Sequence, residues 1–297
     1  TTTTTTTSDA TDSRNGTEDD DDDDVQKHDK TKNLLSVQEC LDAYNNNNNK
    51  NVLFLDASWY HKGERNGRTE FLEGSRIPGS FYWDMDDIAC SKELYPNLNP
   101  NGLRTMLPPP ELFSAVLTHY LGLSSASSAS KQQQHSIIIY AKHGSIFTPR
   151  TWFTFRHYLL NNNNNIRVHL MQGSLEEWID FGGPIDTTRT TVPRAKDLLE
   201  MSSSSRRNEK KETTPATAAT FQGANKNEDE EASSTAVRIA TLDDVLQLLN
   251  NNNDNKNTTL ILDPRGSSFA KKGHMPGAIH IPYSLLVDSN EPLRLKP

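Results

Sequence analysis

Short apolar runs alternate along this chain with stretches that have the 3.6-residue apolar period of an amphipathic helix. After Ser36, apolar residues at 37, 40, 41 and 44 predict a helix, and Ser36 with Glu39 forms the pattern of a capping box. The runs VLFLD (52–56), SIIIYA (136–141) and IRVHLM (166–171) predict buried strands. Strands that alternate with helices in this way are typical of an α/β fold with a parallel sheet covered on both faces.

Further helices are predicted between and after these strands. One follows Pro108-Pro-Pro110, one begins at Thr148-Pro149 as N-cap and first turn, and a short one begins at Ser174. In open parallel sheets, chemistry is expected in the loops at the carboxyl ends of the strands. The tight loop from Lys142 to Phe147, directly after the second strand run, is such a position.

The first part of this pattern occurs twice in the chain. A second helix opens at Thr241-Leu-Asp-Asp244, and the run TLILD (259–263) again ends in an aspartate. A Pro-Gly corner follows each strand, at 78–79 and at 276–277, and a short apolar run follows each corner. The order of helix, strand, excursion, Pro-Gly corner and strand therefore indicates an internal repeat.

Composition places the domain boundaries. The chain has 297 residues, which is enough for two domains, and only 33% of them are hydrophobic. Residues 1–32, with a Thr run and the acidic block 18–24, predict a disordered tail, and residues 187–237 predict a polar linker. The domains expected are a complete one at 33–186 and the first half of a second at 238–297.

Charge and cysteine content exclude several classes of protein. The first 30 residues hold ten acidic and three basic residues, which account for −7 of the net charge of −8, so the body is nearly neutral and has no basic footprint for nucleic acid. No apolar run reaches the ~18 residues that a membrane span needs. Two cysteines cannot form a disulfide framework, which favours a reducing compartment.

Five segments of the first part resemble the first half of two-domain rhodanese-type sulfurtransferases, the thiosulfate and 3-mercaptopyruvate group. They are LFLDASWY, RTEFLEGSRIPGSFYWDMDDI, MLPPPELFSAVLTHYLGL, PRTWFTFRHY and GSLEEWIDFGGP. LILDPRGSSFAKKGHMPGAIHIPYSLLVD resembles the opening of the second half of such proteins. The resemblance covers about 33–186 and 238–297 and implies tandem rhodanese-like domains.

This resemblance also implies an activity. In the family, a cysteine on a loop of the second domain takes sulfane sulfur from thiosulfate or 3-mercaptopyruvate as a persulfide. It then passes the sulfur to cyanide or to a thiol, including the thiol of a thioredoxin-like protein. No metal, cofactor, nucleic-acid or membrane partner is implied, and the expected location is intracellular, in mitochondria or cytoplasm.

The nucleophile is not found in this chain. Ala141 stands at the nucleophile position of the first domain, as expected for the non-catalytic copy, and His143 and Ser145 in the loop after it are interpreted as structural. Pro297 comes before the second loop, so the chain is expected to be truncated ahead of the catalytic cysteine. Cys40 is expected to pack in the core, and Cys90 follows a run of acids that raises a thiol pKa, so no catalytic residue is predicted.

Arg265, directly after the strand that ends at Asp263, matches the substrate-binding arginine of the family; a surface or Asp-paired arginine is the equal alternative. Lys271 or Lys272 is a weaker candidate for a second cation. The mercaptopyruvate branch also places an Asp and a His of the first domain near the site, where this chain has Asn66 and Arg76. A catalytically inactive binding or regulatory module is the alternative function, and a phosphatase-like relative is a third.

Overall fold

The structure, a computed structural model of the chain, describes most of the two predicted domains. The residues that it describes are 32–47, 51–61, 65–123, 134–159, 165–209, 239–251, 259–288 and 294–296. The predicted tail at 1–32 lies outside the described residues except for Lys32, and so does the predicted linker beyond residue 209.

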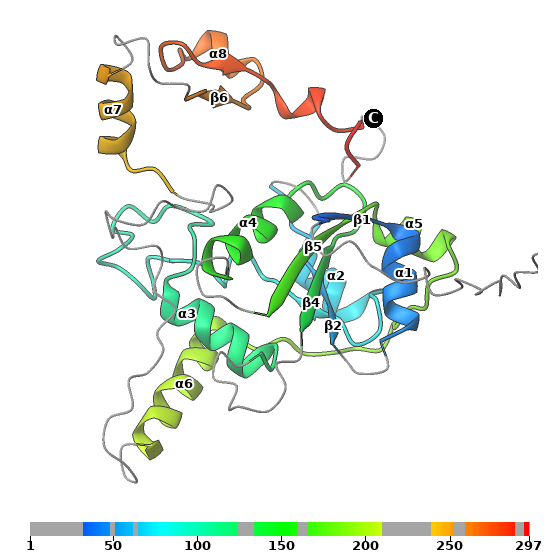
Figure 1. The fold of residues 1–297 in the computed structure, drawn as a ribbon. Helices are drawn as coiled ribbons and strands as arrows, with labels where there is room; N and C mark the ends of the chain where they lie inside the picture. The colour runs from blue at the N-terminus through cyan, green and yellow to red at the C-terminus, as the bar shows by residue number, and fades with distance from the viewer. Residues whose placement is uncertain are drawn as a thin grey trace, which may run out of the picture. The chain divides into compact units, whose positions relative to one another are not determined.

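Five parallel strands form the central sheet in the order β1–β5–β4–β2–β3 (Figure 1). They are β1 (Leu34–Ser36), β2 (Val52–Asp56), β3 (Phe81–Tyr82), β4 (His135–Tyr140) and β5 (Ile166–Gln172). The three runs predicted as buried strands are β2, β4 and β5, which are neighbours in the middle of the sheet. The predicted α/β fold with a parallel central sheet is confirmed.

Helices cover both faces of this sheet (Figure 1). They are α1 (Val37–Asn45), α2 (Gly67–Glu73), α3 (Pro110–Ala115), the π-helical turn η1 (Val116–Tyr120), α4 (Thr148–Leu159), α5 (Leu175–Asp180) and α6 (Ala195–Glu209). Ile138 and Tyr140 of β4 share a core cluster with residues of α1 and α5, whereas Ile137 and Ile139 share one with α3, α4 and α6. Successive residues of a strand face opposite sides, so a sheet covered twice needs the continuous apolar run that β4 has.

Helix α6 begins inside the segment that the sequence predicts as a linker, 187–237. Ala195 and Leu198 are 0% and 1% exposed and belong to the same core cluster as residues of α3 and η1. Upstream, Arg76 and Asp186 form an antiparallel bridge, and Arg68 donates to the carbonyl of Val192. The first part of the predicted linker therefore packs on the first domain. The apolar residues of α6 are confined to its first turns, and the serine-rich second half of the helix has no apolar period, so the sequence did not predict a helix here.

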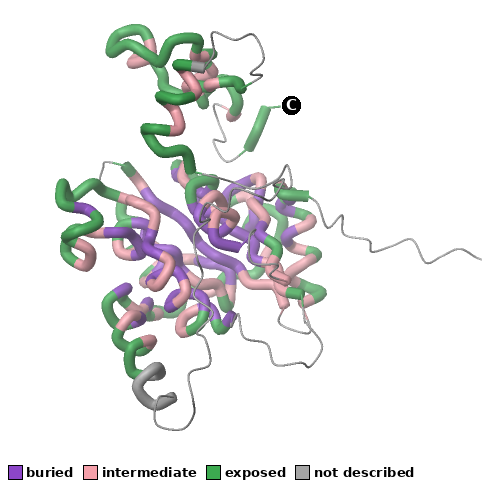
Figure 2. Tube along the Cα trace, turned by 60° about the vertical axis from the view of Figure 1, so that its left-hand side comes forward, coloured by how far each residue is buried: buried purple, intermediate pink, exposed green. Residues whose placement is uncertain are grey.

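The C-terminal region contains a second, smaller sheet. Its elements are α7 (Leu242–Asn251), β6 (Leu262–Asp263), α8 (Ser268–Lys271), β7 (Ile279–His280) and the 3-10 helix η3 (Tyr283–Leu285). Strands β6 and β7 pair in parallel, and within the described residues no further strand joins them. The burial-coloured tube is purple along the central sheet and mostly green and pink in this region (Figure 2).

Local signals of the repeat are the same in both copies. Helix α1 has the predicted capping box between Ser36 and Glu39, and Thr241 and Asp244 bond reciprocally at the start of α7. Gly79 and Gly277 follow proline at φ values of +73° and +74°, which only glycine adopts without strain. These turns set the direction in which β3 and β7 return to the strand before them.

Candidate substrate site and the loop after β4

The loop at 141–147 lies between β4 and α4 at the carboxyl edge of the central sheet. Ala141 is fully buried, and Lys142 and Ser145 are 7% and 0% exposed. In enzymes that use such a loop, inward-pointing amides and the helix N-terminus behind them bind an anion or hold a thiolate. Ala141 brings no thiol to this loop.

Polar groups of the first domain occupy the loop instead. The amide of Lys142 donates to Ser58 Oγ at 2.9 Å, and the amide of His143 donates to Glu176 Oε2 at 2.8 Å. Ser145 Oγ accepts from the amide of Trp59 at 3.2 Å, which agrees with a structural role for Ser145. The carboxylate of Glu176 therefore takes up the amide of His143. The sequence gave no sign of this contact, because 33 residues separate the two partners.

Asp56 lies beneath the loop at the end of β2 and is fully buried. Its Oδ1 accepts from the amide of Ser58 at 2.8 Å, while Oδ2 has no hydrogen-bond partner in the part of the chain that the structure describes. Burial raises the pKa of Asp56 to about 6, against the opposing effect of the Ser58 hydrogen bonds and the Lys142 charge. Hydrogen bonds and nearby charge therefore offset only part of the cost of burying the ionised carboxylate of Asp56.

The structure gives Asn66 and Arg76 structural contacts. Asn66 is the N-cap of α2, and its side chain accepts from the amide of Thr69 at 2.9 Å. Arg76 is 4% exposed, and its guanidinium pairs with Asp186 Oδ2 at 2.6 Å and donates to the carbonyl of Phe71. Arg76 therefore holds the chain after α5 against the domain, and neither residue forms the acid–base pair of the mercaptopyruvate branch.

A polar groove of about 380 Å³ lies beside Asn66. Several of its polar side chains have a partner. Asp84 Oδ2 lies 2.8 Å from Arg68 and 3.8 Å from Arg194, and Trp59 Nε1 donates to Asp86 at 2.8 Å. Sequence reasoning missed this ion network, because its members come from separate segments. Three arginines and three aspartates line the groove, so its formal charges balance and favour no particular ligand charge.

Both cysteines are buried in the first domain. Cys40 is 0% exposed on the inner face of α1, as the sequence predicts, and burial raises the pKa of its thiol far above the ordinary range. Cys90 is 4% exposed, and burial followed by the charge of Glu111 raises its pKa as well. The acids before Cys90 in sequence are not the cause. A thiolate nucleophile is disfavoured at both positions.

Arg265 lies at the carboxyl end of β6 and is paired with the aspartate that ends this strand. Its Nη2 is 2.6 Å from Asp263 Oδ2 and 2.9 Å from the carbonyl of Gly273, and Nε is 2.9 Å from Asp263 Oδ1. These hydrogen bonds hold the pKa of Asp263 down at about 2. The guanidinium remains exposed on its other side, and Nη1 has no hydrogen-bond partner among the described residues.

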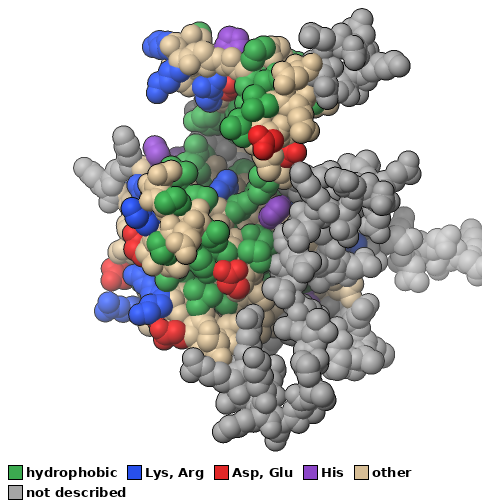
Figure 3. All heavy atoms as spheres, turned by 90° about the vertical axis from the view of Figure 1, so that its left-hand side faces the viewer, with side chains coloured by type: hydrophobic (Ala, Val, Ile, Leu, Met, Phe, Trp, Pro, Cys, Tyr) green, Lys and Arg blue, Asp and Glu red, His purple; other side chains and the backbone are tan. Residues whose placement is uncertain are grey.

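Lysine and histidine residues follow Arg265 in the same segment. Lys271 and Lys272 are exposed at the end of α8, and the rings of His274 and His280 stack on Phe269 at centroid distances of 3.9 and 4.2 Å. His280 Nε2 lies 2.6 Å from the carbonyl of Arg265. Blue and purple side chains gather at the top of the space-filling view (Figure 3). This part of the chain presents an exposed basic surface that can attract a small anion.

Comparison with known proteins places this architecture. No family model matches the chain. A probable 3-mercaptopyruvate sulfurtransferase of Schizosaccharomyces pombe is 29% identical over 162 residues, which are 54% of this chain and 46% of the relative. Bovine thiosulfate sulfurtransferase is 28% identical over 133 residues, 44% of this chain and 37% of the relative. The matches thus cover less than half the length of these relatives.

Solved structures agree with this kinship at the level of the fold. Escherichia coli SseA, described as a 3-mercaptopyruvate sulfotransferase with the rhodanese fold, aligns with a TM-score of 0.56 and 20% identity over 90% of this chain and 80% of its own. Saccharomyces cerevisiae Tum1 aligns with a TM-score of 0.57 and 19% identity over 90% and 74%. The chain therefore has the rhodanese fold, and in sequence it is similar to thiosulfate and 3-mercaptopyruvate sulfurtransferases.

Within the described residues, no helix is long and apolar enough to cross a membrane.

Proposed function

We propose that this chain is the substrate-binding part of a sulfurtransferase that moves sulfane sulfur from thiosulfate or 3-mercaptopyruvate to a thiol or cyanide. The observation that carries the proposal is kinship with sulfurtransferases of both donor classes together with the rhodanese fold. In the proposed reaction, a cysteine thiolate attacks the outer sulfur of thiosulfate and sulfite leaves with the electron pair of the broken S–S bond. The acceptor then takes this sulfur and frees the thiolate.

In this proposal, neither cysteine of these 297 residues supplies the thiolate. Ala141 carries no sulfur, and Cys40 and Cys90 are buried with raised pKa values. Thiocyanate formation from thiosulfate and cyanide is therefore expected to stay at background for this chain. Turnover that disappears in Cys90→Ser, with Cys40→Ser as the matched control, contradicts this part of the proposal.

Arg265 is proposed to bind the anionic donor with the side of its guanidinium that Asp263 leaves exposed. Arginine suits this role because its planar fork matches carboxylate and sulfonate oxygens. Thiosulfate binding by titration calorimetry should weaken about ten-fold in Arg265→Gln, the size of one charged hydrogen bond. Lys92→Gln is the control, since it removes one exposed charge of the same sign from the first domain. If both variants bind thiosulfate equally well, Arg265 does not bind the donor and serves only to pair with Asp263.

An inactive rhodanese-like binding or regulatory module is the second candidate. It is supported by the loop after β4, in which Glu176 meets the amide of His143. Sequencing of the transcript across the codon for Pro297 separates the two candidates. A reading frame that continues into a cysteine loop supports the enzyme, and a stop codon supports the module.

The partners proposed are a small anionic sulfur donor and a thiol acceptor, for which a thioredoxin-like protein is the leading class. Mitochondria or cytoplasm are the proposed locations, since an Arabidopsis thaliana relative is named as mitochondrial. Fluorescence microscopy of the tagged natural gene product tests the location.

A further inference from the structure

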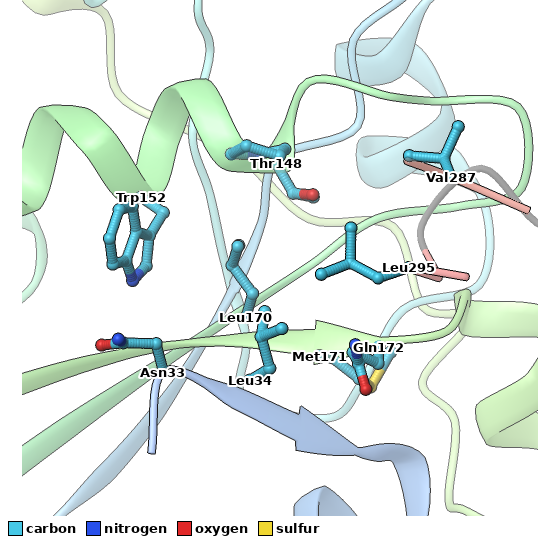
Figure 4. A pocket seen from close by; sticks show the side chains of 10 residues that line it. Asn33, Leu34, Thr148, Trp152, Leu170, Met171, Gln172, Val287 and Leu295 are labelled. Atoms are coloured by element: carbon cyan, nitrogen blue, oxygen red, sulfur yellow. The ribbon is translucent and has the colours of Figure 1, made fainter. Parts of the chain in front are cut away.

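An apolar groove runs along the outer edge of the central sheet, where β1 and β5 meet the start of α4. From the first domain, Leu34, Pro149, Trp152, Leu170 and Met171 line it. Asn33, Thr148 and Gln172 complete the side that the first domain forms. The other side is formed by Val287 and Leu295, more than a hundred positions further along the chain. Figure 4 shows Leu295 across from Thr148 and Leu170, with Val287 beside it. The cavity enclosed between the two sides is about 280 Å³.

Val287 and Leu295 reach this groove from a small antiparallel pair. Val287 and Leu295 form a β-bridge with each other. The amide of Asp288 donates to the carbonyl of Arg294, and the amide of Lys296 donates to the carbonyl of Leu286, both at 2.9 Å. These bonds place the two apolar side chains next to each other. We name residues 286–288 and 294–296 the clasp.

An ion pair joins the clasp to the first domain a second time. The guanidinium of Arg294 pairs with the carboxylate of Glu177 on α5, whose side chain is 21% exposed. Exposure along the same segment singles out Val287 as the covered residue. Leu285, Leu286 and Leu295 are 61%, 52% and 47% exposed, whereas Val287 is partly covered.

We propose that the β1–β5 groove is the docking seat of the clasp of the same molecule, and that this contact ties the C-terminal region to the first domain. The sheet of β6 and β7 leaves Leu262 and Ile279 57% and 44% exposed, so it has little core of its own to order it. Val287 and Leu295 find apolar partners in the groove, and Arg294 finds an opposite charge beside it. The occupant is therefore the clasp, in preference to a second copy of the chain. The inference does not depend on sulfur transfer.

Trp152 is a natural reporter of the groove. In the full chain labelled with 5-fluorotryptophan, the Trp152 resonance is assigned by its loss in Trp152→Phe. Leu295→Asp puts a charge into the apolar groove and should move this resonance toward that of a solvent-exposed tryptophan, while the other three tryptophan signals stay in place. Leu285→Asp is the matched control, because it adds the same charge on the same segment at a residue outside the groove. Equal Trp152 signals in the two variants overturn the proposal.

Reversing the charges of the Arg294–Glu177 pair distinguishes loss of docking from misfolding of the clasp. Arg294→Glu should speed amide exchange at 286–288 about ten-fold, which corresponds to the loss of a charged contact. The double variant Glu177→Arg with Arg294→Glu should return most of this protection. Failure of the double variant to recover any protection contradicts docking on α5. Sedimentation velocity on the same samples should give a monomer; a dimer that the Leu295→Asp change dissociates assigns the groove to a second copy and overturns the proposal.

Discussion

In both copies of the repeated unit, a strand ends in an aspartate and pairs in parallel with the short strand that follows a Pro-Gly corner. The register is the same, since Leu55 pairs with Phe81 and Leu262 with Ile279. Equivalent amides make equivalent bonds, from Trp83 to the carbonyl of Asp56 at 2.8 Å and from Ile281 to that of Asp263 at 3.0 Å. The local structure of the two copies is therefore very similar.

Burial separates the two copies. Leu55 is 1% exposed and Leu262 is 57% exposed, although both stand one residue before the aspartate. Strand β2 has neighbours on both edges, β3 and β4, whereas β6 pairs with β7 alone among the described strands. The comparison shows that a strand and its register form from local sequence, while its stability comes from the strands and helices around it.

The largest difference is expected in hydrogen exchange of the two matched amides. The amide of Ile281 should exchange at least about a thousand-fold faster than that of Trp83, because opening β6 and β7 exposes little buried surface, whereas opening β2 and β3 disrupts the core. Exchange read by NMR at neutral pH measures both amides in one sample. Equal protection of the two amides means that the C-terminal region folds as a stable unit by itself.

The second-largest difference is expected in the free energy of unfolding when the matched leucines, Leu55 and Leu262, are each changed to alanine. Leu55→Ala removes a buried side chain from the main core and should lower the free energy of unfolding by about 3 kcal/mol. Leu262→Ala changes an exposed position and should stay within about 0.5 kcal/mol. Urea denaturation followed by circular dichroism measures both variants. A cost of similar size for Leu262→Ala shows that the second copy has a core that this structure lacks.

The two strand-ending aspartates should titrate far apart. Carboxyl 13C shifts are expected to give a pKa of about 6 for Asp56, raised by burial, and about 2 for Asp263, lowered by the hydrogen bonds from Arg265. Because folding favours protonated Asp56, its stabilising effect is complete below pH ~4, the pKa of the unfolded chain, and is lost as pH rises through 6.

Asp56→Asn tests the consequence for stability. It keeps an oxygen acceptor for the amide of Ser58 and removes the charge, so the protein should gain on the order of 2 kcal/mol above pH 7 and little at pH 4. Thermal or urea unfolding at the two pH values measures this change. A variant that is less stable at both pH values shows that the charge of Asp56 is compensated by groups beyond Ser58 and Lys142.

The smallest difference is expected at the helix caps. Ser36→Ala removes the side-chain bond to the amide of Glu39 and should cost about 1 kcal/mol in global unfolding, since α1 packs on the sheet. Thr241→Ala removes the same kind of cap from α7 and should leave global unfolding unchanged while it speeds local exchange in α7. A global effect of equal size places α7 in the same cooperative unit as α1.

Sequence alone determined the features that depend on neighbours along the chain. The apolar period and the Ser36–Glu39 box located α1, the three apolar runs located β2, β4 and β5, and the Pro-Gly corners located both returns. The inward position of Cys40 also followed from the helix period. These features were readable because backbone hydrogen bonding, capping and turn geometry involve residues only a few positions apart.

Tertiary structure decided what depends on residues far apart in sequence. The pairing of Glu176 with the His143 amide, the Arg76–Asp186 pair and the packing of α6 on α3 each join segments more than 30 residues apart. The same holds for Asp56 and Asp263, which look alike in sequence. One is buried with an unsatisfied oxygen and the other is paired with Arg265, because burial and dielectric environment are set by the whole fold around a side chain.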